Sequence, residues 1–143
     1  MRVRARGVAA LLLLSVAFGP ATAGEVAKQG QSSTIKLQHV VAGHLVALNG
    51  KYELRVTEVR YVPGGFIGEH HHAGPGVRCL TAGDLTYVQP DRTTVYHPGD
   101  CFFESGDVSH TAENKGHAAV VLLNFEVLPL AWSGSSAVPV PEK

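Results

Sequence analysis

The sequence predicts an all-β domain, a sandwich or a barrel, and three observations indicate this class. Residues 52–62 alternate between apolar and polar side chains, as expected of a strand with one buried face. Short apolar or β-branched runs follow at close spacing, separated by glycine and proline. No helical periodicity appears after the N-terminal segment. Antiparallel closure of eight or nine short strands would bury their apolar faces and hide the sheet edges.

The first 23 residues have the pattern of a secretory signal peptide. A basic start is followed by an apolar run over residues 7–19, and Ala21-Thr22-Ala23 provides a small-x-small cleavage site. The apolar run is short for a bilayer span, and no second long one follows. We therefore expect cleavage after Ala23, a periplasmic or secreted protein, and no stable membrane insertion after cleavage. An uncleaved N-terminal anchor is the alternative.

Composition indicates a single domain and argues against nucleic acid as a partner. The chain has 143 residues, of which 45% are hydrophobic, enough for a single domain with a proper core. Cleavage removes three arginines and no acidic residue, which leaves 9 basic and 12 acidic residues and a net charge near −3. A weakly acidic domain without a basic stripe is not typical of nucleic-acid binding.

The N-terminal half of the mature chain is predicted as a flexible segment that leads into strands. Residues 24–34 are polar and predict a flexible N-terminus. Residues 35–48 predict a short strand or a turn of helix, and Asn49 with Gly50 is a hairpin signal. In the strand at 52–62, Tyr52, Leu54 and Val56 form the apolar side of the pattern, and the glycines after Pro63 end it.

The C-terminal half predicts several more strands and then a tail. Glycine, proline and asparagine turns separate the predicted strands. These strands are 77–81, 85–88, 93–96, 101–103 and 118–128. Residues 35–130 would then form the barrel, and residues 131–143, rich in glycine, serine and proline, would form a C-terminal tail.

A run of three histidines is the main functional signal. On a strand, His70 and His72 point to one face and His71 to the other. Two residues span about 7 Å at roughly 3.3 Å per residue, so both imidazoles can bind one divalent metal. His110 is the best candidate for a third ligand. A solvated, histidine-rich polar loop is the alternative.

The spacing of these residues resembles the two motifs of the cupins, small jelly-roll β-barrels. The first motif has a glycine, five residues and His-x-His, as Gly64, His70 and His72 do here. In the second motif, Gly99, His110 and Asn114 keep the spacing, although Ser105 replaces proline and Asp107 replaces glycine. The resemblance covers residues 52–128 and implies a single-domain, cupin-type jelly-roll barrel with a metal near one mouth.

The resemblance implies His70, His72 and His110 as metal ligands and a supporting role for Asn114. Gly76 stands where the metal-binding glutamate of the motif usually lies. We therefore expect a three-histidine variant of the site. The divalent ion would be Fe, Mn, Zn, Cu or Ni, with open positions for water, substrate or oxygen. Some cupins with incomplete ligand sets bind no metal.

The pattern leaves two placements open for each of two charged residues, Glu104 and Arg78. Glu104 precedes the turn to His110, so it is a candidate catalytic base that points into the cavity. Phe103 and Glu104 face opposite ways, and a solvent-facing Glu104 is the alternative. Arg78 shares the face of Gly76 and would need a carboxylate partner inside the barrel, so a position at the rim is slightly favoured.

Cupin topology also implies that Cys79 and Cys101 lie on neighbouring strands. In an exported protein they would form a disulfide, worth roughly 3 kcal/mol on the chain-entropy model. Two independent buried thiols are the alternative.

The leading function is an exported protein that binds a divalent metal through three histidines and that could act as a metal-dependent, dioxygenase-like enzyme on a small organic substrate. The alternative is a non-catalytic periplasmic protein that binds a metal or a small ligand, and an eroded site is a third reading. Cupins are often dimers through edge strands, and residues 35–48 would supply such an edge for a homodimer.

Overall fold

The structure is a computed structural model that describes residues 25–141, so the predicted signal peptide, residues 1–23, lies outside the described residues. This part of the chain is almost entirely β-strand. No helix within it is long and apolar enough to cross a membrane. Its elements are β1 (Lys28–Val40), η1 (Val46–Leu48), β2 (Tyr52–His72), β3 (Gly76–Ala82), β4 (Leu85–Gln89), β5 (Arg92–Tyr96), β6 (Cys101–Glu104), β7 (His110–Glu113), β8 (Val120–Pro129) and β9 (Ala137–Pro139).

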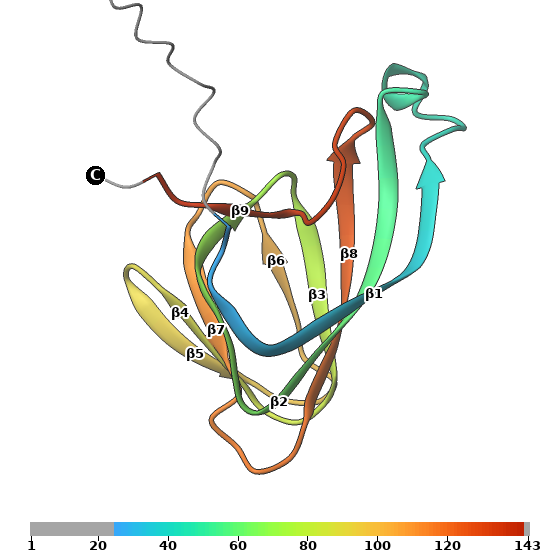
Figure 1. The fold of residues 1–143 in the computed structure, drawn as a ribbon. Coiled ribbons are helices and arrows are strands. Elements are labelled where there is room, and N and C mark those ends of the chain that lie inside the picture. The colour runs from blue at the N-terminus through green and yellow to red at the C-terminus, as the bar shows by residue number, and fades with distance from the viewer. Residues whose placement is uncertain (1–24, 142–143) are drawn as a thin grey trace, which may run out of the picture.

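The strands form one sheet that curls into a nearly closed barrel. The order is β5-β4-β7-β2-β8-β3-β6, and β1 and β9 also pair with β2. Figure 1 shows β4, β5 and β7 on one side and β3, β6 and β8 on the other, with β2 common to both. All pairs are antiparallel. The predicted all-β jelly-roll fold is therefore confirmed.

Strand β2 joins the two sides because it bends at its glycines. Residues 52–61 pair with β8, whereas Phe66, Ile67 and His70 pair with β7. Between them, Gly64 has a φ of +73°, and a Cβ on Gly65 would lie 2.7 Å from the Gly30 carbonyl oxygen. The strand continues through this bend, so the prediction that these glycines end it was wrong. The bend carries the histidine run to the opposite side of the barrel.

The inward face of β2 differs from the predicted one. Leu54 is 46% exposed, whereas Glu53 and Arg55 are 4% and 5% exposed. The two charges pair, with Arg55 Nη2 2.6 Å from Glu53 Oε1, and Gln38 donates to Glu53 at 2.6 Å. The prediction that Leu54 lies on the buried face was therefore wrong, because a hydrogen-bonded charge pair occupies the inner face at this end of β2.

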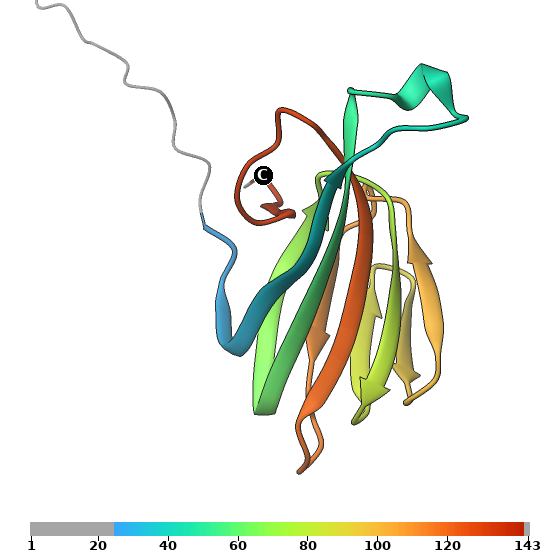
Figure 2. The ribbon, with the colours of Figure 1, turned by 90° about the vertical axis from the view of Figure 1, so that its right-hand side faces the viewer.

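Both ends of the described chain form strands where the sequence predicted flexible segments. The strand β1 begins at Lys28, inside the segment predicted as flexible, and β9 lies inside the predicted tail. Both pair with β2. Figure 2 shows β1, in blue, running alongside β2. Backbone groups on the edges of β2 need hydrogen-bond partners, and polar segments can supply them.

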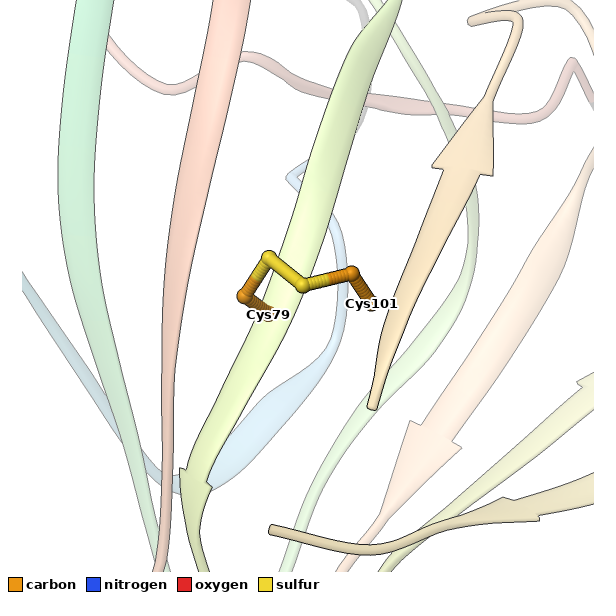
Figure 3. The surroundings of a disulfide bond; sticks show 2 residues. All are labelled: Cys79 and Cys101. Atoms are coloured by element: carbon orange, nitrogen blue, oxygen red, sulfur yellow. A yellow bond between two sulfur atoms is a disulfide. The ribbon is translucent and has the colours of Figure 1, made fainter. Parts of the chain in front are cut away.

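The barrel core and a disulfide hold the strands together. The buried apolar side chains form one cluster from both sides of the barrel: Val59, Tyr61, Ile67, Leu80, Leu85, Tyr87, Ala112, Val120 and Leu122. Cys79 on β3 and Cys101 on β6 are directly paired and joined by a disulfide, with Cα atoms 4.1 Å apart (Figure 3). The predicted disulfide is confirmed.

Candidate metal centre

Three histidines converge inside the barrel. His70 and His72 end β2, and His110 begins β7, where it pairs directly with His70. All three are buried, and one ligand atom from each lies within 4.8 Å of the others. His71 lies between them on β2, so its side chain points to the other face of the strand. The alternative of a solvated histidine loop was therefore wrong.

Acceptors outside the cluster fix the orientation of the imidazole rings. His70 Nδ1–H donates to the Gly68 carbonyl oxygen at 2.8 Å, and His110 Nδ1–H donates to that of Val108 at 3.2 Å. A neutral ring with its proton on Nδ1 has a free lone pair on Nε2. Metal-binding histidines in proteins have this second hydrogen bond almost always.

The protonation state also fits metal binding. Burial lowers the pKa of His70 to about 3, and burial likewise lowers the pKa of His110. Both rings are therefore neutral at physiological pH, the form in which imidazole binds a metal.

Glu104 points into the cluster. It is 8% exposed, whereas its neighbour Phe103 is 69% exposed. Its Oε1 lies 3.2 Å from His110 Nε2, and its Oε2 lies 3.2 Å from His72 Nε2. Burial alone would raise the pKa of Glu104, but the charge of Arg78 holds it below its usual value. The solvent-facing alternative for Glu104 was wrong.

Arg78 is buried between two carboxylates, and the favoured position at the rim was wrong. It is 2% exposed. Its Nη2 lies 2.6 Å from Glu104 Oε2 and 3.0 Å from Glu126 Oε1. The partners come from β6 and β8, the two strands that flank β3. They replace the water contacts that a rim position would provide.

Glu126 is a site residue that was not predicted from the sequence. It is 2% exposed, and its Oε1 lies 3.4 Å from His72 Nδ1 and accepts a hydrogen bond from Ser136 Oγ at 2.6 Å. A signal was present, because Glu126 is an even-numbered residue of β8 like the buried Val120 and Leu122. It therefore had to share their inward face.

Asn114 supports the turn after β7, as expected. It is fully buried, and its amide donates to the carbonyl oxygens of Tyr61 and Ala118 at 3.2 and 2.8 Å. Its side-chain oxygen accepts from Gly116 N–H at 3.0 Å.

The histidines open onto a cavity of about 580 Å³. Apolar and aromatic side chains line it, among them Tyr87 and Phe102, and residues 132–137 are also part of its lining. Arg55 Nη1 donates to the Gly134 carbonyl oxygen at 2.8 Å and holds this segment. The cavity is large enough for a small organic molecule.

The residues fit a divalent transition metal. Three inward-facing imidazole nitrogens and one carboxylate are donors that Fe, Mn, Zn, Cu and Ni accept. The buried carboxylates also favour a cation at this place, because Arg78 alone neutralises only one of the two.

A comparison with protein families identifies the family of this domain. A family model described as a cupin domain matches residues 57–126. A search of the curated proteins finds no match to this chain.

Solved structures share the fold. A cupin domain from Bordetella pertussis Tohama I is 22% identical with a TM-score of 0.53, over 71% of this chain and 96% of that chain. The polyketide cyclase RemF from Streptomyces resistomycificus is 17% identical with a TM-score of 0.55, over 74% and 75%. An uncharacterised double-stranded β-helix protein from Klebsiella pneumoniae is 18% identical with a TM-score of 0.54, over 77% and 85%. At these identities the likeness concerns the fold alone.

Proposed function

The chain belongs to the cupin superfamily, and from this premise we propose that it binds one divalent transition metal through His70, His72 and His110. The observation that carries the proposal is the convergence of three buried imidazoles whose ligand atoms lie within 4.8 Å of one another. Two of the rings have Nδ1 engaged by backbone oxygens, which leaves Nε2 free.

We further propose a dioxygenase-like oxidoreductase that acts on a small organic substrate in the periplasm or outside the cell. The ion would supply Lewis acidity or one-electron redox chemistry. The chain itself would hold the substrate in the cavity beside Tyr87 and Phe102 and exclude water with residues 132–137. Glu104 is the carboxylate nearest the Nε2 atoms of His72 and His110 and is the candidate catalytic residue. The disulfide supports an oxidising compartment.

A second candidate is a binding protein that does not turn over its ligand. Arg78 lies 2.6 Å from Glu104 Oε2 and holds the pKa of this carboxyl below its usual value, which burial alone would raise. A carboxylate of low pKa is a weak general base at neutral pH. This observation favours metal or small-ligand binding without catalysis.

Metal content of protein purified without chelator tests the binding proposal. We expect near-stoichiometric iron, manganese, zinc, copper or nickel in the wild type. His70→Ala and His110→Ala should lose it, and His71→Ala is the matched control because its side chain faces away from the cluster. A wild type that is metal-free and takes up no added ion would overturn the proposal.

Oxygen uptake separates the two candidates. Metal-loaded protein is incubated with a panel of small phenols and thiols, with His110→Ala as the inactive reference. Metal-dependent oxygen consumption supports the enzyme, and a metal-loaded protein that consumes none with any of these compounds supports the binding protein.

A further inference from the structure

We propose that Glu104 is the fourth metal-binding residue, a carboxylate that reaches the ion from β6 in place of the side chain that Gly76 lacks. This inference rests on the proposed metal site and names a further residue of it. Gly76 is on β3, at the position where the family motif has its glutamate, so the carboxylate would have moved to the neighbouring strand.

The strand register makes this exchange feasible. Gly76 pairs directly with Glu104 between β3 and β6. Directly opposed residues in an antiparallel sheet point to the same face, with Cβ positions about 4.5–5.5 Å apart. A glutamate on β6 can therefore reach the site from the strand beside β3, whereas the Arg78 guanidinium occupies the space that a side chain at residue 76 would need.

The observed distances match those between donors that share one ion. Two donors that each lie about 2.1 Å from a metal, at angles between octahedral and tetrahedral, are about 3.0–3.4 Å apart. Glu104 Oε1 is 3.2 Å from His110 Nε2, and Glu104 Oε2 is 3.2 Å from His72 Nε2. Each carboxylate oxygen thus has a metal-type separation from a different histidine.

The hydrogen bond at His110 Nδ1 orients the opposite nitrogen, Nε2, toward Glu104. Its Nδ1 lies 3.2 Å from the Val108 carbonyl oxygen, which can only accept, so Nδ1 carries the proton. Nε2 then faces a Glu104 carboxylate oxygen at 3.2 Å. A metal ion bound by His110 Nε2 would also be within reach of this oxygen.

Glu126 is the other carboxylate beside Gly76, and its contacts give it a different role. It also pairs with Gly76, but from β8. Its Oε1 faces His72 Nδ1 at 3.4 Å, on the side of the ring away from Glu104, and accepts from Ser136 Oγ. Glu126 is therefore a positioning residue for His72, and Glu104 is the one that faces the Nε2 atoms.

The test compares two isosteric variants that each remove one of these buried charges. Glu104→Gln and Glu126→Gln are purified as full-length protein beside the wild type. Affinity for Co²⁺ is measured by calorimetry, and the visible absorption of bound Co²⁺ reports its ligand set. We expect Glu104→Gln to weaken Co²⁺ binding about 100-fold or more and to change the spectrum. Glu126→Gln should weaken binding by less and keep the shape of the wild-type spectrum.

A crystal structure of the Zn²⁺-loaded wild type keeps the test decisive if Glu104→Gln fails to fold. An ion within about 2.3 Å of a Glu104 oxygen supports the inference, and an ion more than about 3 Å from both oxygens overturns it. Wild-type affinity and spectrum in a folded Glu104→Gln variant would also overturn it. If His70→Ala abolishes binding in that case, the three-histidine site stands and only the fourth residue fails.

Discussion

Gly76 on β3 lies directly opposite Glu104 on β6, and both face the interior of the barrel. The Arg78 guanidinium occupies the space that a side chain at residue 76 would need. The absence of a side chain at Gly76 is therefore part of how two carboxylates and an arginine fit beside the histidines.

Replacement of Gly76 by alanine should destabilise the protein. The added Cβ would overlap Arg78 Nη1 and would lie 2.6 Å from the Phe125 carbonyl oxygen and 3.2 Å from Glu126 Cγ. We expect a loss of about 1–3 kcal/mol in the free energy of unfolding, measured by urea titration, because a packed interior must shift. Gly116→Ala is the matched control, since its nearest contact would be 3.4 Å. Equal stability of the two variants would contradict this account.

Removal of the Arg78 charge should lower the free energy of unfolding more than Gly76→Ala does. Arg78→Met keeps the apolar stem but leaves Glu104 and Glu126 without their shared cation. Breaking a buried ion pair on one side costs about 3–5 kcal/mol, so we expect a loss of this size in urea unfolding. The exposed Arg60, changed to Met, should stay within about 0.5 kcal/mol of the wild type. A similarly small loss for Arg78→Met would argue against the buried pairing.

The histidine cluster could be predicted from the sequence because its geometry depends on short spacings. A period of two residues places His70 and His72 on one face, and the spacing to His110 resembles that of a known family. The two-residue period is a local property of any strand.

Arg78 and Glu126 could not be placed in the same way. Whether a charge is buried depends on partners from other strands, and Arg78 meets its partners on β6 and β8. The first part of β1, which lies in the segment predicted as flexible, and all of β9 were missed for a related reason. They are polar or short and form on the edges of β2, so their own sequence carries little strand signal.

Reduction of the disulfide should lower stability without loss of the fold. The bond closes a loop with a sequence separation of 22 residues, which corresponds to about 3 kcal/mol on the chain-entropy model. Urea unfolding of the wild type with and without dithiothreitol should differ by about this amount. The Cys79→Ala, Cys101→Ala double variant should resemble the reduced wild type and should not respond to dithiothreitol. A response of the double variant would show that the reductant acts elsewhere.

His97 should titrate above its usual range. Its Nδ1 lies 2.9 Å from Asp84 Oδ1, and this hydrogen bond and the carboxylate charge raise the pKa of His97. A raised folded-state pKa means that the pair stabilises the protein below pH 6.5 and that the stabilisation is lost as the pH rises through the folded-state value. A pH titration followed by NMR of the imidazole should give a lower midpoint in Asp84→Asn. Equal midpoints would exclude the interaction in solution.

Removal of the C-terminal segment that lines the cavity should affect both stability and metal exchange. Truncation after Ser133 deletes the Gly134 carbonyl that Arg55 contacts, the Ser136 hydroxyl that Glu126 contacts, and β9. A hydrogen bond to a charged group contributes about 1.5–3 kcal/mol, so we expect at least this loss in urea unfolding.

The same truncation exposes His72, because β9 pairs with β2 at this residue. Release of bound Co²⁺ to excess chelator should therefore be faster than in the wild type. Truncation after Val140 is the control, since it keeps β9 and both hydrogen bonds. Equal release rates and equal stability for the two truncations would mean that this segment neither supports nor covers the site.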